Sequence, residues 1–231
     1  MSPGRPRFSD SVFINCPFDA EYWPVFEAII FCVLDCGFVP RCALEEADSG
    51  TFRLNKIQEI IRRSEYTIHD LSRVELSTDT RLPRFNMPFE LGLDIGCRVY
   101  GSRQTRRKKC LILDSDLFRY KAFLSDISGQ DIQNHQNSPA KAINVVRHWL
   151  RIVSKRGTVP GPIAINERFA RFTNDLPALC DGSGLNRNDL QFVEYVTLAE
   201  AWLRADKEAS SQPNKRLESD ARKARAAHPR R

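Results

Sequence analysis

The stretch VFINCPFDAEYWPVFEAIIFCVLDCG, residues 12–37, has the pattern of a strand followed by a helix. Its first five residues, 12–16, form a short run rich in β-favouring side chains. From residue 19 onward the apolar side chains recur every three or four positions, and the pattern ends at Gly37, a residue typical of helix ends. A strand that leads directly into a helix predicts the first unit of an α/β fold.

The same alternation continues along the chain. Residues 38–44 predict a second strand, which contains a proline and is therefore expected near a sheet edge. A helix over 51–64, a strand over 65–72, a helix containing Glu90 and a strand over 109–114 follow. Strands that alternate with helices predict a flavodoxin-like, doubly wound parallel sheet of four or five strands with helices on both faces.

Beyond this unit the apolar spacing is helical, most clearly over 139–153 and in the run that contains Phe192, Val196, Ala199 and Leu203. We expect these helices to pack on the sheet domain or on a partner subunit. The predicted organisation is a flexible leader at 1–10, an α/β domain at 11–155, a helical extension at 156–205 and a basic disordered tail at 206–231.

The composition is that of an ordinary globular protein. The chain has 231 residues, of which 42% are hydrophobic and 28% charged. No apolar run approaches the roughly 20 residues that span a bilayer, and no apolar segment of a secretory signal follows the first residues. We therefore expect a cytoplasmic protein without a membrane partner.

The net charge of +6 is concentrated at the end of the chain. From Arg204 onward there are nine Lys or Arg against four Asp or Glu, which is +5 and leaves about +1 for the rest. Nucleic acid is therefore expected as a partner only through the basic tail. The seven cysteines are expected as reduced thiols, and the spacing of Cys32 and Cys36 fits no zinc pattern, so no metal is expected.

Glu90 lies in the run RFNMPFELGLDIG, residues 84–96, which otherwise has buried character. A buried carboxylate is costly unless it is paired or employed. One interpretation is a helix start with Asn86 as N-cap, where the helix dipole favours an acidic residue. However, glycine inside a helix costs about 1 kcal/mol against alanine. Gly92 and Gly96 therefore suggest backbone packed close to a neighbour or a ligand.

Ligands of open parallel sheets bind at the carboxyl ends of the strands, where the strand order reverses. With the order 2-1-3-4 this point lies between the first and third strands, so residues 15–18 and 69–72 are candidates. Glu90 and Asp70 are expected to converge on this crevice. Paired carboxylates in a crevice are typical of enzymes that break bonds at a sugar carbon.

These residues carry a resemblance to a known family. FINCPFDAEYWPVFEAI, KIQEIIRRSEYTIHDLS and NMPFELGLDIG resemble the TIR-like nucleotide-binding domains of bacteria and, more distantly, are similar to nucleoside 2-deoxyribosyltransferases. The resemblance covers roughly residues 11 to 114. It is carried by the turn Pro17-Phe18, the pair Asp70-Leu71 and the helix start with Asn86, Glu90, Leu91 and Gly92. It departs at His69 and at a longer loop, 73–84, that would gate or block the site.

The resemblance implies that Glu90 is catalytic and that the chain cleaves the N-glycosidic bond of NAD or a related nucleotide, as an effector of antiphage defence. It also implies NAD as substrate rather than as cofactor. A homo-oligomer or an activating partner protein is a possible requirement. The alternatives are a nucleoside 2-deoxyribosyltransferase with Glu90 as nucleophile, and a non-catalytic nucleotide-sensing or protein-interaction module.

The chemistry distinguishes the substrates. Breaking a ribose C1′–N bond builds positive charge on the sugar, which a fixed carboxylate stabilises or attacks. Nicotinamide leaves NAD as a neutral ring and needs no proton. A purine or pyrimidine needs one, and Asp70 would then act as a general acid with a raised pKa, instead of only orienting the site.

The remaining candidates for substrate binding each have a structural alternative. Phe18 would stack on a base or pack in the core, Arg41 would meet a phosphate or a surface carboxylate, and Asp48 with Ser49 would contact ribose or form a plain turn. The full predicted set is catalytic Glu90 and Asp70, with substrate contacts from Asn15, Pro17, Phe18, Arg41, Asp48, Ser49, Ser72 and Asn86.

Overall fold

The computed structural model describes residues 6–45, 50–74, 84–157 and 159–227, with side chains through Ser210. Five parallel strands form one sheet in the order β2-β1-β3-β4-β5. The strands are β1 (Ser11–Asn15), β2 (Val39–Arg41), β3 (Tyr66–Asp70), β4 (Lys109–Asp114) and β5 (Gln133–Asn134). The predicted α/β fold is confirmed, and so is the edge position of the proline-containing strand β2.

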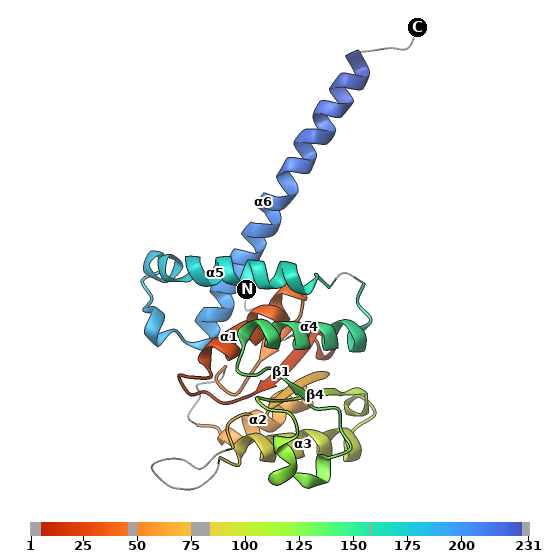
Figure 1. Cartoon of the computed structure of the whole chain (residues 1–231), viewed down its shortest axis with the longest axis vertical. Helices are drawn as coiled ribbons and strands as arrows, with labels where there is room; N and C mark the ends of the chain where they lie inside the picture. The colour runs from red at the N-terminus through yellow and green to blue at the C-terminus, as the bar shows by residue number, and fades with distance from the viewer. Residues whose placement is uncertain (1–5, 46–49, 75–83, 158, 228–231) are drawn as a thin grey trace.

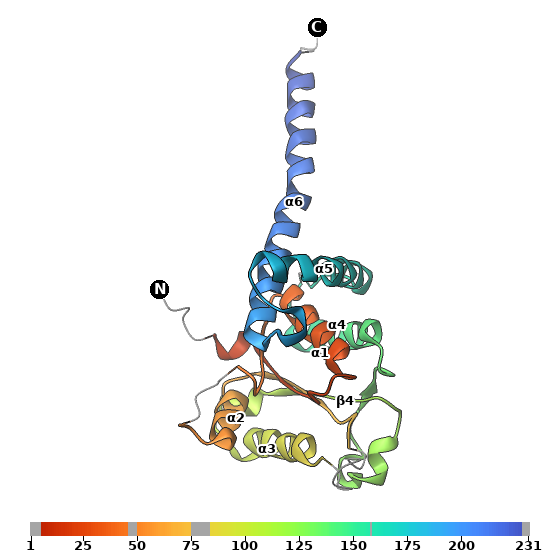
Figure 2. The ribbon, with the colours of Figure 1, turned by 90° about the vertical axis from the view of Figure 1, so that its left-hand side faces the viewer.

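Helices cover both faces of the sheet (Figure 2). The helices are α1 (Trp23–Asp35), α2 (Arg53–Arg62), α3 (Asn86–Tyr100), α4 (Pro139–Ser154), α5 (Pro162–Gly182) and α6 (Phe192–Ala227). Short 3-10 turns are η1 (Phe8–Asp10), η2 (Thr105–Arg107), η3 (Arg119–Ala122), η4 (Ser125–Ile127) and η5 (Arg187–Asp189). Helices α1 and α4 lie on one face and α2 and α3 on the other.

The strand order places a reversal between β1 and β3. Strand β2 lies on one side of β1 in the sheet, and β3 lies on the other side. Helix α1 connects β1 to β2 and helix α2 connects β2 to β3, and these two helices lie on opposite faces of the sheet. Both strands are fully buried, as expected for the centre of a covered parallel sheet. Their carboxyl ends, Asn15 and Asp70, therefore border the crevice where doubly wound folds bind ligands.

The C-terminal helices share a core with the sheet domain. Phe31 of α1 stacks on Phe172 of α5 at 5.2 Å between ring centroids, and the Tyr195 hydroxyl of α6 donates to the Glu27 carbonyl at 3.0 Å. One buried apolar cluster joins the strands with α1, α4, α5 and the first turns of α6. The expected packing of the helical extension on the sheet domain is thus what the structure has.

Residues 206–227, part of the segment expected to be a disordered tail, have a helical backbone. Helix α6 continues to Ala227 and projects beyond the rest of the molecule (Figure 1). Although residues 206–227 lack an apolar face, they are rich in Ala, Arg, Lys and Glu, which are strong helix formers. Across the described ranges, no helix is both long and apolar enough to cross a membrane.

Candidate functional site

The first turn of α3 is fixed to the carboxyl edge of the sheet. The side-chain amide of Asn15, at the end of β1, donates to the Met87 carbonyl at 3.0 Å. Asn86 is the first residue of α3 and is exposed, whereas Phe85 takes the N-cap position without a side-chain cap. The prediction of Asn86 as N-cap is therefore wrong. Asn15 performs the anchoring instead, through a contact between residues far apart in the sequence.

Glu90 lies one turn into α3 and is 8% exposed. Among the described residues, none donates a hydrogen bond to its carboxyl group or forms an ion pair with it. Burial raises the pKa of Glu90 to about 7, and the nearby charge of Arg53 opposes this only in part. Glu90 is thus a buried carboxyl group that gains and loses its proton near neutral pH.

Asp70, at the end of β3, is fully buried and accepts four hydrogen bonds. The Tyr22 hydroxyl donates at 2.6 Å, the Ser72 backbone amide at 2.8 Å and His135 Nε2 at 2.9 Å, and the Ser72 hydroxyl donates as well. Burial alone would raise the pKa of Asp70, but the hydrogen bonds from His135, Ser72 and Tyr22 outweigh it, so the pKa is lowered. Asp70 stays ionised, which contradicts its predicted option as a general acid.

Tyr22 and His135 are the two residues of this network that lie outside the predicted set. His135 has its Nε2 next to Asp70. Its Nδ1 accepts from the backbone amide of Asn137 at 3.1 Å, so in the neutral ring the proton is on Nε2. Nε2 faces the Asp70 carboxylate and, at 3.0 Å, the Ser72 oxygen. Because Nε2 is a donor, it cannot take a proton from Ser72. The arrangement of Ser72, His135 and Asp70 is therefore not a nucleophilic triad.

The charges of Asp70 and Glu90 both influence the residue after β1, although the two carboxyl groups form no hydrogen bond with each other. The thiol of Cys16, the residue after β1, has its pKa raised by burial and then by the charges of both carboxylates. The oxygens of Asp70 are occupied by Tyr22, Ser72 and His135. The structure therefore brings the two predicted acids to one edge of the sheet, but only Glu90 has a carboxyl group without a described partner.

The other predicted contacts divide into three groups. Arg41 forms a two-pronged ion pair with Glu45, with Nε to Oε2 at 2.6 Å, so its guanidinium faces a carboxylate rather than an open phosphate position. Pro17 is buried, and Phe18 is half-buried beside a cavity. Asp48 and Ser49 lie outside the described residues.

The predicted gating loop, 73–84, is described only at its ends. Arg73 Nη2 lies 3.7 Å from Asp19 Oδ1, and Arg84 Nη1 lies 3.5 Å from Asp19 Oδ2. Both ends of the loop are therefore held beside the segment that follows β1. The gate itself stays a prediction.

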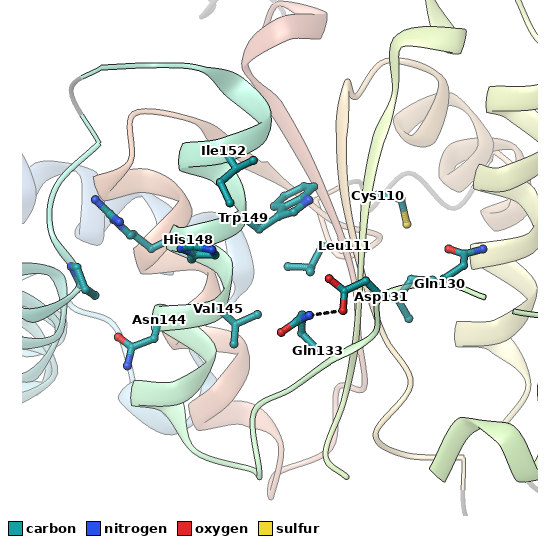
Figure 3. A pocket seen from close by; sticks show the side chains of 13 residues that line it. Cys110, Leu111, Gln130, Asp131, Gln133, Asn144, Val145, His148, Trp149 and Ile152 are labelled. Atoms are coloured by element: carbon teal, nitrogen blue, oxygen red, sulfur yellow. Dashed lines mark hydrogen bonds between the residues drawn. The ribbon is translucent and has the colours of Figure 1, made fainter. Parts of the chain in front are cut away.

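Three of the surface cavities that the described residues line have volumes typical of small-molecule sites. The largest of the three, about 770 Å³, lies between α4 and the edge of β4, where β5 pairs only with Leu113 and Asp114. Figure 3 shows Val145, Trp149 and Ile152 of α4 on one side of it and Leu111 on the other. None of these three cavities is lined by Asp70 or Glu90.

The glycines of α3 line the groove of about 600 Å³ between α2 and α3. A Cβ atom added at Gly92 or Gly96 would meet nothing within 4 Å. The first part of the prediction, backbone packed against a neighbour within the chain, is therefore wrong, because the space next to both glycines is open. The second part, backbone that a ligand approaches closely, stays a prediction. Phe89 and Tyr100 border the same groove and are 53% and 88% exposed.

Within the part of the chain that the structure describes, one cluster has side chains that could ligate a metal, namely His69, Asp94 and Cys110. His69 Nδ1 accepts from the Asn15 amide at 3.0 Å, so the ring proton is on Nε2 and the nitrogen that faces Asp94 has no lone pair to offer. Lys108 already neutralises Asp94, with Nζ at 3.0 Å from Oδ1. The pKa of Asp94 is about 2, since hydrogen bonding to His69 and the charge of Lys108 outweigh burial. With the His69 proton on Nε2 and Asp94 paired with Lys108, these residues do not fit a metal ion.

Comparisons with known proteins add no relative: no family model matches the chain, and neither a curated protein nor a solved structure matches it. The resemblance to TIR-like domains is therefore carried by the sequence stretches alone.

Proposed function

We propose that the chain is a nucleotide N-glycosidase that cleaves the ribose–nicotinamide bond of NAD or a related nucleotide. Glu90 is its catalytic carboxylate and Asp70 a positioning residue. The observation that carries this proposal is the buried Glu90 carboxyl group, without a described partner, at the carboxyl edge beside the strand-order reversal. A group that is costly to bury and stabilises nothing around it is typical of a functional site.

In the proposed reaction the C1′–N bond breaks and its electron pair goes to the nicotinamide ring, which leaves neutral. Positive charge develops on the ribose, and ionised Glu90 stabilises it until water adds to C1′ and releases a proton. Desolvation by the surrounding protein strengthens this attraction. No step requires a proton donor.

Asp70 supports this choice of leaving group. Its lowered pKa keeps it ionised, so it offers no proton to a departing purine or pyrimidine. Its hydrogen bonds join Tyr22 before α1, Ser72 after β3 and His135 after β5. We therefore assign Asp70 the task of holding three segments of the carboxyl edge together.

The test is release of nicotinamide from NAD by the purified protein, compared with Glu90→Gln, which keeps the shape of the side chain. We expect the variant to lose at least a hundredfold in rate, about the effect of removing one electrostatic stabiliser. Glu200→Gln, at an exposed position of α6, is the matched control and should keep full activity. Equal release by wild type and Glu90→Gln would refute the assignment.

The same assay distinguishes the alternatives. Base exchange between two nucleosides, lost in Glu90→Gln, would identify a deoxyribosyltransferase. Nucleotide binding without release or exchange at any protein concentration would identify a sensing or interaction module. If copies of the chain must assemble, the rate per chain should rise with protein concentration.

The proposed role is that of a cytoplasmic effector in antiphage defence. It predicts that expression lowers cellular NAD and arrests growth, and that Glu90→Gln does neither. Arrest that persists in Glu90→Gln would point to a mechanism other than NAD cleavage.

A further inference from the structure

A cavity of about 530 Å³ opens where β1 leads into α1, and neither Glu90 nor Asp70 lines it. Its wall combines the segment after β1, the start of α1, Leu44 after β2 and the residues from η5 to the start of α6. These segments meet where Arg187 donates to Glu27 and where Phe26 stacks on Phe192. Helix α1 itself lies on the same face of the sheet as α4 (Figure 2). Its volume lies within the range of small-molecule sites. The lining residues are Phe18, Ala20, Trp23, Leu44, Arg187, Asn188, Asp189, Leu190, Gln191 and Phe192.

Two aromatic side chains in this wall are held by a third. Phe18 and Trp23 each pack against Phe26, at 5.3 Å between ring centroids and interplanar angles of 74° and 66°. Phe18 and Trp23 are only half-buried, so part of each ring remains available to the cavity that both line. Aromatic rings held in this way are suited to stacking on a flat heterocycle.

Two charged groups next to the aromatic wall, Glu27 and Arg187, are paired with each other. Glu27 accepts from Trp23 Nε1 at 3.0 Å and from Arg187 Nη2 at 2.8 Å. The first bond fixes the indole ring, and the second neutralises the guanidinium. The cavity therefore presents an aromatic wall without an unpaired charge from this group, which favours a neutral ring over an anion.

Two of the lining residues, Asn188 and Gln191, carry side-chain amide groups. The Asn188 side-chain amide makes no hydrogen bond with another described residue. Gln191 donates from Nε2 to the Asp189 carbonyl at 3.0 Å, which leaves its Oε1 as an acceptor. A carboxamide presents a donor and an acceptor side by side, and this pair matches the amino group and ring nitrogen of adenine.

We propose that this cavity binds the adenine ring of a nucleotide, stacked on Phe18 and Trp23 and hydrogen-bonded by Asn188. That the ring belongs to the substrate cleaved at Glu90 rests on the function proposed above, whereas binding of the ring does not. Uracil has a smaller face to stack, and its edge carries a carbonyl and a ring N–H where adenine has an amino group and a ring nitrogen, so it binds more weakly.

The test is titration of the full chain with adenosine by calorimetry, together with the fluorescence of Trp23. Ala20→Phe fills the cavity from an exposed position without removing a core side chain, and Ala205→Phe on α6 is its matched control. We expect adenosine to bind to wild type, Ala205→Phe and Glu90→Gln alike. Affinity should fall about tenfold or more in Ala20→Phe, and uridine should bind wild type at least tenfold more weakly.

Adenosine should also quench tryptophan fluorescence in wild type, and this quenching should disappear in Trp23→Phe. The proposal is overturned if wild type does not bind adenosine at millimolar concentration, if Ala20→Phe binds it equally, or if uridine binds as well. Adenosine binding without nicotinamide release would leave this site standing and remove the proposed reaction. Release without adenosine binding would do the reverse.

Discussion

Asp70 and Glu90 lie at the same edge of the sheet and differ in almost every physical respect. Asp70 is fully buried, accepts four hydrogen bonds and has a lowered pKa. Glu90 is nearly as buried, has no described partner, and has a pKa raised to about 7. The Asp70 carboxylate therefore stabilises the fold, whereas an ionised Glu90 destabilises it. This difference identifies Glu90, not the pair, as the candidate for chemistry.

The largest expected effect on stability is at Asp70, the carboxylate that accepts four hydrogen bonds. Asp70→Asn replaces an acceptor oxygen by an NH₂ group that faces donors from Tyr22, Ser72 or His135. We expect a loss of about 3 kcal/mol or more in the free energy of unfolding, measured with urea, as for breaking a buried charged network. Asp181→Asn, at an exposed position of α5, should change it little. A loss below about 1 kcal/mol in Asp70→Asn would mean that the network contributes little.

A third buried carboxylate sharpens the comparison. Asp94 of α3 is 2% exposed and pairs with buried Lys108, which also donates to the Ile61 carbonyl at 2.6 Å. Lys108→Met should cost about 3 kcal/mol, because it leaves Asp94 without its cation. Adding Asp94→Asn should recover part of that loss, which a double-mutant cycle measures. Additive losses would show that the two side chains are not coupled.

Glu90→Gln should raise the free energy of unfolding, whereas the substitutions at Asp70 and Lys108 lower it. The folded pKa of about 7 lies above the usual value of 4.5, so the folded state loses stability as pH rises between these two values. At pH 8 the variant should therefore be more stable than wild type by about 3 kcal/mol. Near pH 4 the difference should vanish, because both states hold the proton. Urea unfolding at the two pH values measures this, and a variant that is less stable at pH 8 would contradict it.

The smallest expected effect concerns the glycines beside Glu90. Gly92→Ala should raise the free energy of unfolding by about 0.5 to 1 kcal/mol, because the added Cβ meets nothing and alanine favours helix. Gly101→Ala is the contrasting variant, since its Cβ would lie 2.2 Å from the Cys97 carbonyl oxygen. Thermal unfolding of both variants, with assay of activity, checks this. A destabilised Gly92→Ala would restore the interpretation that α3 has a close neighbour.

The sequence predicts the sheet and its first helices because their signal is local. Strand β4 occurs at 109–114 as expected, and α4 begins at Pro139 as its spacing indicates. Strand β5 contains only Gln133 and Asn134, two polar residues without any periodicity, so its position could not be predicted. His135 follows β5 and was missed for the same reason.

The site is predictable in its residues but not in its contacts. Glu90 and Asp70 are found from the segment in which each occurs, yet the opposite states of the two carboxyl groups depend on tertiary partners. Tyr22 and His135 are 48 and 65 residues away from Asp70 in the chain. Similarly, the glycine pattern of α3 does not reveal whether the adjoining space is filled or open.

The most direct test of the contrast between the two carboxylates is a carbon NMR titration of the side-chain carboxyl groups. The Glu90 signal is identified by its absence in Glu90→Gln. We expect it to titrate near pH 7, while the Asp70 signal shows no step in the neutral range. A Glu90 signal that titrates near 4.5 would show that its carboxyl group is solvated or paired, and the case for Glu90 as the reactive group would fail.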